Sequence, residues 1–411
     1  MIPLTVRSSY SLIWGVNSPE RICARARELG YTKLALTDRD NLYGLWEFVK
    51  ASKRHGVTPI IGAEVSDTSG PESVVCLAEN GEGYSNLCRI LTRRHCDEAF
   101  KLADAVVTYS SGLLVLSSSP AMLENLKNNC VNAVAALGGR PDQQSDTARR
   151  AAIRLGIPAV VTADAYFLQR QDYELHRILR AIALNTSLSR LKTSDIASAE
   201  SWLASPAEYR KRFEVWPGVA DATIELSERL SFHGPEFGLV MPQWLGLNEE
   251  QAAAVLAEKA YAGAEWRYGS PLPEAVRARM AYELDMIGRM RFTAYFLVVQ
   301  DIVKRSPRIC GRGSGAASIV AYCLGITNVC PIKYKLYFER FLNPGRKDPP
   351  DIDVDFAWDE RDELIGSVLA QYRNHSAMVC NHVLFQPRMA IREVARSEER
   401  RVGKECRSRW S

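Results

Sequence analysis

Residues 18–37, SPERICARARELGYTKLALT, set out the pattern on which the fold prediction rests. Ser18 followed by Pro19 is typical of a helix start, and Gly30 is typical of a helix end, because glycine adopts the left-handed conformation that closes many helices. The mostly apolar run 33–37 then predicts a buried strand. A helix followed directly by a strand is the repeating unit of α/β folds.

The same alternation continues on both sides of this unit. Strands are predicted at 4–7, 33–37, 58–65, 73–77, 113–117, 132–137 and 158–162, and helices between them. This order predicts a mainly parallel sheet or an α/β barrel over residues 1–233. Glycines and prolines within 234–246 predict a connector, and mostly helical patterns follow it.

Composition restricts the class of protein. The 411 residues are 46% hydrophobic and 24% charged, with a net charge of +4, which is typical of a globular protein with a sizeable core. The ten cysteines form no CxxC pair, which favours free thiols. Neither a signal peptide nor a long apolar run is found, so we expect a cytoplasmic location and no membrane partner.

The motif most indicative of chemistry is PPDIDVDF at 349–356. Because side chains alternate across a strand, Asp351, Asp353 and Asp355 are expected on one face and the apolar residues on the other. Carboxylates gathered on one face favour Mg²⁺, which takes oxygen ligands and shares them with substrate phosphates. The alternative is an exposed acidic edge strand, which discourages aggregation.

Two segments ahead of the acids could contact phosphate. The glycine-rich turn at 311–314 precedes a helix predicted at about 314–324, so N–H groups there would face an anion. Arg340, Arg346 and Lys347 follow. Taken singly, such a turn is usually only a helix cap, and such cations are more often surface charges. Taken in order with the acids, they match the needs of nucleotidyl transfer, which depends on positioning and charge neutralisation.

At this point the chain resembles the bacterial C-family DNA polymerases, the family of the polymerase III alpha subunit. The resemblance rests on TAYFLVVQDIV at 293–303, GRGS at 311–314, YCLGIT at 322–327, and the segments 338–344 and 350–356. It implies that residues 247–380 are the first part of an incomplete nucleotidyltransferase palm of the polymerase-beta type, an α+β fold. Residues 381–396 would begin the thumb.

The resemblance also implies roles for single residues of the palm. Asp351 and Asp353 would be two of three catalytic carboxylates that hold two Mg²⁺ ions. The residues expected to contact the incoming nucleotide are Arg312, Gly313, Ser314, Arg340 and Arg346. The resemblance ends near residue 396, before the third carboxylate, so we expect the chain alone to be inactive.

The N-terminal region resembles the PHP (polymerase and histidinol phosphatase) domain, a distorted α/β barrel, through YSL at 10–12, LTD at 36–38, NLYG at 41–44, PIIG at 59–62 and NLCR at 86–89. Metal-bearing members of that family carry histidines at the mouth of the barrel. In this chain the corresponding degenerate site consists of Thr5, Arg7, Asp38, Arg39, Glu64, Asp164 and Tyr166. Cations cannot replace imidazole ligands, so we expect no metal there and expect the arginines to pair with the remaining carboxylates.

Together the two resemblances imply the N-terminal portion of a DNA-directed DNA polymerase. Its substrates would be primer–template DNA and deoxynucleoside triphosphates, and a sliding clamp and accessory factors would bind through regions outside this chain. A short stretch at 301–311 and the segment 382–392 favour the error-prone, translesion branch. A PHP-type metallophosphoesterase and a non-catalytic scaffold remain alternatives. The polar segment 397–411 is interpreted as a natural tail or a non-native junction, outside the fold prediction.

Overall fold

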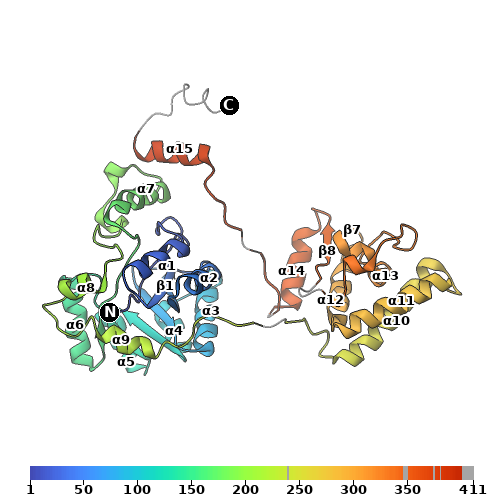
Figure 1. Cartoon of the computed structure of the whole chain (residues 1–411), viewed down its shortest axis with the longest axis horizontal. Coiled ribbons are helices and arrows are strands. Elements are labelled where there is room, and N and C mark those ends of the chain that lie inside the picture. Colours follow the sequence, from blue (N-terminus) through green and yellow to red (C-terminus); the bar gives the residue numbers. More distant parts are fainter. Residues whose placement is uncertain (238–239, 346–349, 374, 380, 400–411) are drawn as a thin grey trace. The chain divides into compact units, whose positions relative to one another are not determined.

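The computed structural model describes residues 1–237, 240–345, 350–373, 375–379 and 381–399 (Figure 1). The chain divides into two compact units. The first, which we call the barrel unit, contains Met1–Glu236 and the chain from Leu384 onward; the second unit is Phe237–Val383. The first break falls inside the predicted connector 234–246, and the second falls inside the segment 381–396.

The barrel unit is built around a six-stranded sheet in the order β1-β2-β3-β4-β5-β6. Its strands are β1 (Lys33–Arg39), β2 (Thr58–Ser66), β3 (Ser73–Ala78), β4 (Leu113–Ser117), β5 (Ala133–Ala136) and β6 (Ala159–Val160). Only β3 runs against the others, since its pairings with β2 and β4 are antiparallel and the remaining pairings are parallel. The turn between β2 and β3 is too short for the crossover that parallel strands require. The predicted mainly parallel α/β sheet is therefore confirmed with this one reversal.

The strand predicted at 4–7 is present only as a linking segment. Val6 forms an isolated bridge to Ala165. On one side the Ala35 and Thr37 amides of β1 donate to Pro3 and Val6, and on the other side the segment exchanges backbone hydrogen bonds with Ala165. Residues 161–165 continue from β6, so this segment joins the two edges of the sheet and curls it into a distorted barrel.

Helices surround the sheet, and residues typical of helix termini cap the start of α1 and the end of α2. Ser18 caps the first helix by accepting from the Arg21 amide, and Gly56 closes the second with a φ of 64°. The helices of this unit are α1 (Pro19–Glu28), α2 (Leu45–His55), α3 (Gly81–Cys96), α4 (Leu102–Thr108), α5 (Pro120–Asn128), α6 (Gln143–Leu155), α7 (Tyr173–Ala183), α8 (Pro206–Arg212), α9 (Ala222–Glu228) and α15 (Pro387–Ser397), with 3₁₀ turns at η1 (Arg170–Asp172), η2 (Leu188–Arg190) and η3 (Thr193–Asp195).

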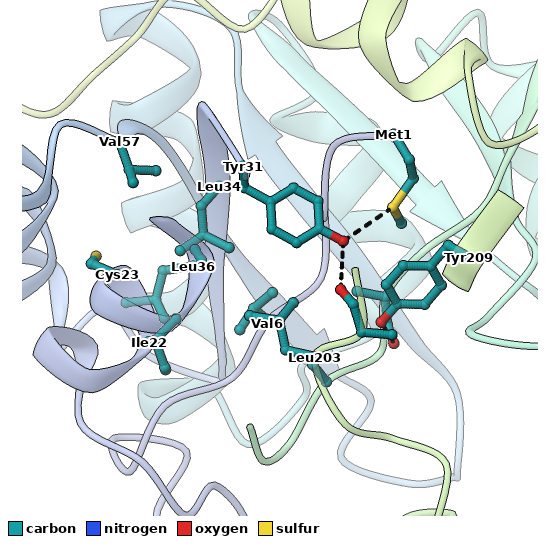
Figure 2. Packing of buried hydrophobic residues seen from close by; sticks show 14 of the residues in the cluster. Met1, Val6, Ile22, Cys23, Tyr31, Leu34, Leu36, Val57, Leu203 and Tyr209 are labelled. Carbon is teal, nitrogen blue, oxygen red and sulfur yellow. Dashed lines mark hydrogen bonds between the residues drawn. The ribbon is translucent and has the colours of Figure 1, made fainter. Parts of the chain in front are cut away.

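Between the sheet and its helices lies a large apolar core, part of which Figure 2 shows. Tyr31 is fully buried there, and its hydroxyl donates to the Ala204 carbonyl at 2.7 Å, with the sulfur of Met1 at 3.8 Å. Burying a phenol costs free energy unless its hydroxyl forms a hydrogen bond. These contacts meet that need, and they connect Met1 and Ala204 to the segment between α1 and β1.

The interior of the curled sheet is filled by apolar residues towards the starts of its parallel strands. Ile60, Leu114 and Val134 fill it near the strand starts, where Leu226 and Leu230 from α9 and the residues after it cover them. Glu64 has the same parity along β2 as Ile60, so it faces the same interior but lies towards the carboxyl ends of the parallel strands. That end is the mouth at which barrel folds carry their active sites.

The second unit packs helices against a small two-stranded sheet. Its elements are α10 (Glu249–Tyr268), α11 (Glu274–Arg289), α12 (Thr293–Val303), β7 (Ile309–Arg312), η4 (Gly313–Ala317), α13 (Ile319–Cys323), η5 (Phe338–Arg340), β8 (Asp353–Phe356) and α14 (Arg361–Gln371). Asn248 and Gln251 form a capping box at the start of α10. Small residues let α10 approach α13 closely, and a Cβ on Gly263 would lie 2.0 Å from the Cys323 carbonyl oxygen.

The helix predicted at about 314–324 is divided. Residues 313–317 form the 3₁₀ turn η4, and α13 begins only at Ile319, with Ser318 accepting from the Ala321 amide. Ser314 is therefore part of the turn and does not cap the helix. No helix among the described residues is both long enough and apolar enough to cross a membrane.

Candidate functional site

The predicted acid strand lies directly beside the predicted phosphate turn. β8 pairs antiparallel with β7, and the register sets Asp353 opposite Arg312 and Asp355 opposite Cys310. Since β7 runs straight into η4, the pairing brings the carboxylates to the start of the turn at Gly313. Two motifs that are about forty residues apart in the sequence thus form one surface of the second unit.

Glycine is required where the turn meets the acids. Gly313 has a φ of 70°, and a Cβ at this position would lie 2.9 Å from Oδ2 of Asp353. At the other end of the motif, a Cβ on Gly311 would lie 2.3 Å from the Ile326 carbonyl oxygen. The glycines therefore allow the turn to touch both the carboxylate and the loop after α13.

The alternation of exposed and half-buried residues predicted for 351–356 is confirmed, although β8 begins only at Asp353 and Asp351 precedes the strand. Asp351, Asp353 and Asp355 are exposed, whereas the apolar residues between and after them are half-buried against the core of the second unit. Burying one face anchors β8 and leaves the acids on the other face.

One of the three acids is already paired. The Arg312 guanidinium lies 3.0 Å from a carboxylate oxygen of Asp355, and both side chains are about 60% exposed. Such an exposed pair contributes little to stability because solvent screens it. Among the described residues, Arg312 is the cation that pairs with this strand, and its ion pair involves Asp355, not Asp351 or Asp353.

Tyr295 also belongs to this site. It lies in the motif TAYFLVVQDIV, but the sequence predicted no role for it. It lies on α12, and its hydroxyl accepts a 3.1 Å hydrogen bond from the Ile352 amide, between the two acids. Burial raises the pKa of Tyr295, and the carboxylates of Asp351 and Asp353 raise it further. The tyrosine therefore holds the backbone at the start of β8. Only the motif TAYF could have pointed to it.

Two of the other residues predicted to contact the nucleotide lie on neighbouring turns, without a hydrogen bond or ion pair to the acids in the described part of the chain. Ser314 is exposed on η4, and Arg340 is exposed at the end of η5, which packs against η4. Arg346 lies outside the described residues. Within the described ranges no cluster of three or more His, Cys, Asp or Glu side chains is arranged to hold a metal ion. Asp351 and Asp353 offer the oxygen ligands that Mg²⁺ prefers, but two carboxylates fall short of the set of three.

The predicted degenerate site at the barrel mouth is organised around Arg7. Its Nε lies 2.6 Å from Oε2 of Glu64, and its Nη1 lies 3.5 Å from Oδ1 of Asp164. The side chains of Arg7 and Glu64 are each only 6% exposed. Burial alone would raise the pKa of Glu64, but Arg7 and then Arg39 outweigh it, so the pKa lies below its usual range. The Arg7 guanidinium also stacks over Tyr166, 4.4 Å from the ring centroid.

The other members of this site have different partners from those expected. Asp38 accepts three hydrogen bonds of 2.7 Å, from the Ser8 amide and from the hydroxyls of Ser8 and Ser11. Burial nevertheless raises the pKa of Asp38. The carboxylate that Arg39 approaches is Asp40 and not Asp38, with Nε of Arg39 3.9 Å from Oδ2 of Asp40. The sequence predicted no role for either serine, although Ser11 lies in the YSL motif and Ser8 is two residues before Tyr10.

Thr5, Arg7 and Asp164 line a cavity of about 310 Å³ at the barrel mouth. The Thr5 hydroxyl accepts from the Asp164 amide at 2.7 Å, and Asp164 has an unusual φ of 43°. The remaining wall combines hydroxyl and apolar side chains with the charged residues Arg140, Asp142 and Glu200. The described residues of this cavity include no histidine, so imidazole-based metal or acid–base chemistry has no group to perform it there.

His176 lies behind the site, 5.8 Å from the Tyr166 ring, and is fully buried. Its Nδ1 lies 2.8 Å from the Trp14 carbonyl oxygen, and its Nε2 accepts from the Ala197 amide at 2.9 Å. This pattern requires the neutral ring, and burial followed by Arg180 lowers the pKa.

We therefore expect the barrel unit to lose stability as the pH falls below about 6.5, where the unfolded histidine gains a proton and the buried His176 does not. Denaturant unfolding between pH 7.5 and 5 measures the slope of the free energy of unfolding against pH, and His176→Gln should flatten that slope. An equal slope in the variant would contradict the assignment.

Comparisons with known proteins assign each half of the chain separately. Residues 3–156 match the PHP domain, and residues 254–404 match the Bacterial DNA polymerase III alpha NTPase domain. The second match extends to residue 404, beyond the point near residue 396 at which the resemblance was expected to end, so that expectation is corrected. Among solved structures, an amidohydrolase from Chromobacterium violaceum aligns with 39% of this chain and 86% of its own, at 15% identity and a TM-score of 0.31.

Whole-chain relatives are polymerases of two kinds. DNA polymerase III subunit alpha is 31% identical in Treponema pallidum and in Bacillus subtilis, over 96% of this chain and 38% of each relative. An error-prone DNA polymerase of Anaeromyxobacter dehalogenans is 28% identical over 96% of this chain and 44% of that protein. The chain thus spans about two fifths of the length of these relatives, and the comparisons do not separate the two branches.

Proposed function

Since the chain joins a PHP domain to a bacterial DNA polymerase III alpha NTPase domain, we propose that it is the N-terminal portion of a DNA-directed DNA polymerase. Primer–template DNA and deoxynucleoside triphosphates would be the substrates of the whole enzyme. We place it in the cytoplasm and, from the segments at 301–311 and 382–392, in the error-prone branch. A clamp and accessory factors would bind through regions outside this chain.

In the proposed reaction a primer 3′-hydroxyl attacks the α-phosphate of a nucleoside triphosphate, and pyrophosphate leaves. Asp351 and Asp353 would hold Mg²⁺, which when bound neutralises charge on the reacting phosphates. The backbone at Gly313 and Ser314 would orient the triphosphate, because a glycine turn exposes N–H groups to an anion. Arg340 would add positive charge from the neighbouring turn. Two ions would require a third carboxylate beyond this pair.

The observation that carries the proposal is the register of β7 and β8. It sets Asp353 against the start of the turn, with Oδ2 only 2.9 Å from where a Cβ of Gly313 would be. An acidic strand that served only to prevent aggregation would need no such neighbour. A carboxylate beside a glycine turn is what a metal–triphosphate complex needs.

Binding of dATP to this chain tests the proposal. We expect binding that requires Mg²⁺ and that Asp353→Asn weakens by about tenfold or more, because a charged ligand to the ion becomes neutral. Asp355→Asn is the matched control, since it makes the same change on the same strand face but removes only the partner of Arg312. It should leave affinity unchanged or raise it.

Titration with dATP followed by NMR, with and without Mg²⁺, gives these affinities. Equal losses of dATP affinity in the Asp353 and Asp355 variants would mean that the net negative charge of the strand, and not a specific metal-binding carboxylate, governs binding. Binding that ignores Mg²⁺ would contradict the proposal outright.

For the barrel unit we propose a structural and not a catalytic role. Arg7 lies between Glu64 and Asp164, where its charge would oppose a cation. This position argues against the metallophosphoesterase alternative more directly than the missing histidines do. The proposed role is to support the polymerase portion of the longer protein.

A further inference from the structure

A buried ion pair on α11 contacts the phosphate turn from behind. Nε of Arg279 lies 2.6 Å from Oε1 of Glu283, one helical turn further along. The Glu283 side chain is fully buried, and that of Arg279 is 22% exposed. Removing a carboxylate from water is costly, and a pair of apolar residues would often stabilise a fold equally well. The pair therefore calls for an explanation beyond stability.

The carboxylate of Glu283 holds the end of the turn. Its Oε2 accepts two hydrogen bonds, one from the Ser318 hydroxyl at 2.7 Å and one from the Val320 amide at 3.3 Å. The Ser318 hydroxyl in turn caps α13 through the Ala321 amide. One acid thus fixes the point at which η4 stops and α13 begins. Burial raises the pKa of Glu283, so these donors and Arg279 are what favour its ionised form.

The guanidinium of Arg279 connects two separate segments. Its Nη2 donates to the carbonyl of Ala317, the last residue of η4, at 3.2 Å, and to the carbonyl of Leu336 at 3.0 Å. Leu336 leads into η5, which ends at Arg340. Because the guanidinium is rigid, the contact of Nε with Glu283 fixes the position of Nη2, and both carbonyls accept from that one nitrogen.

A third contact from α11 reaches the same segment. The Tyr282 hydroxyl donates to Glu339 at 3.0 Å, next to Arg340. Neighbouring residues of one helix therefore hold both η4 and η5. These are the two segments to which nucleotide contacts are assigned, at Gly313 and Ser314 and at Arg340.

We propose that Arg279 and Glu283 are positioning residues that set the spacing between the glycine turn and the Arg340 turn for a nucleoside triphosphate. The inference rests on the function proposed above. Neither side chain would touch the nucleotide. The ion pair would instead fix the backbone to which the triphosphate binds, so its loss would lower affinity before it unfolds the unit.

Glu283→Gln tests this role in the full chain. The amide keeps one acceptor for Ser318 but presents an N–H group to Arg279, so the fork loses its anchor. We expect dATP affinity in Mg²⁺ to fall by about tenfold, as for a lost charge-assisted hydrogen bond, and amide hydrogen exchange at 313–320 to accelerate. Asp285→Asn is the matched control on the same helix, since its pair with Arg289 is exposed, and it should change neither.

Arg279→Lys is the second variant, which keeps the charge beside Glu283 and so favours folding. A single ammonium cannot contact Glu283 as Nε does and the two carbonyls as Nη2 does, because these contacts come from two separate nitrogens. We therefore expect an affinity between those of the wild type and Glu283→Gln. Wild-type affinity in both variants, with exchange at 313–320 accelerated, would overturn the positioning role and leave the proposed function intact. A wild-type chain that binds no dATP in Mg²⁺ would overturn the proposed function, and this inference with it.

Discussion

Replacing Arg7 with methionine is expected to lower the free energy of unfolding of the barrel unit by about 3–5 kcal/mol at pH 7. The change leaves the Glu64 carboxylate buried without its cation, 2.6 Å from where Nε had been. It also removes the charge beside Asp164. An unpaired buried charge costs far more than the same pair at the surface, where screening by water leaves little to lose.

The pH dependence of this effect has a defined sign. Without Arg7, burial raises the pKa of Glu64 above its unfolded value, so the carboxyl becomes protonated and the destabilisation shrinks as the pH falls towards 5. Chemical denaturation, with hydrogen exchange in β1 and β2 to identify the barrel unit, measures both the loss and its pH dependence.

Two further variants separate charge burial from lost packing. Arg7→Met combined with Glu64→Leu should regain most of the stability, because the buried carboxylate that lost its cation is removed as well. Arg154→Met removes an exposed partner of Glu124 and should change stability by less than about 1 kcal/mol. A double variant as unstable as Arg7→Met alone would show that the ion pair is not what stabilises the barrel mouth.

Gly313→Ala is expected to weaken Mg²⁺-dependent dATP binding by about tenfold or more while costing only about 1 kcal/mol of stability. The small cost arises from a φ of 70° that alanine adopts reluctantly. The larger functional loss arises because the new methyl group lies 2.9 Å from Oδ2 of Asp353 and forces that carboxylate to move. Thermal unfolding and dATP titration of the same sample give the two quantities.

Gly325→Ala provides a control with the same backbone cost. Gly325 has a φ of 78°, and a Cβ there would meet nothing within 4 Å. The two variants should therefore be equally stable and differ in nucleotide affinity. Equal affinities would mean that the turn and the acid strand do not act as one site.

The fold was predictable wherever local signals agreed with packing. The cap at Ser18 and the apolar runs of the sheet led to the correct elements because the strands are buried on both faces. The direction of β3 follows from the short turn between β2 and β3, which leaves no room for a crossover to a parallel strand. The role of 4–7 in joining the sheet edges depends on Ala165, far along the chain, and no local pattern carries that information.

The candidate site was predictable only in part for the same reason. Alternation alone placed Asp351 and Asp353 on an exposed face, as the structure has them. The division of 314–324 at Ser318 was missed because the carboxylate that holds the break, Glu283, comes from a helix over thirty residues earlier. Tyr295 likewise reaches the acids across the fold. Partners distant in sequence are visible only once the helices are packed.

Paramagnetic broadening by Mn²⁺ tests the central claim most directly, because the ion reports its own position. With dATP present, the account predicts that amide signals of 311–314 and 351–355 broaden together, and that the combined Asp351→Asn and Asp353→Asn variant abolishes the effect. Broadening centred on Glu64 and Asp164 at the barrel mouth, or unchanged in that variant, would contradict it.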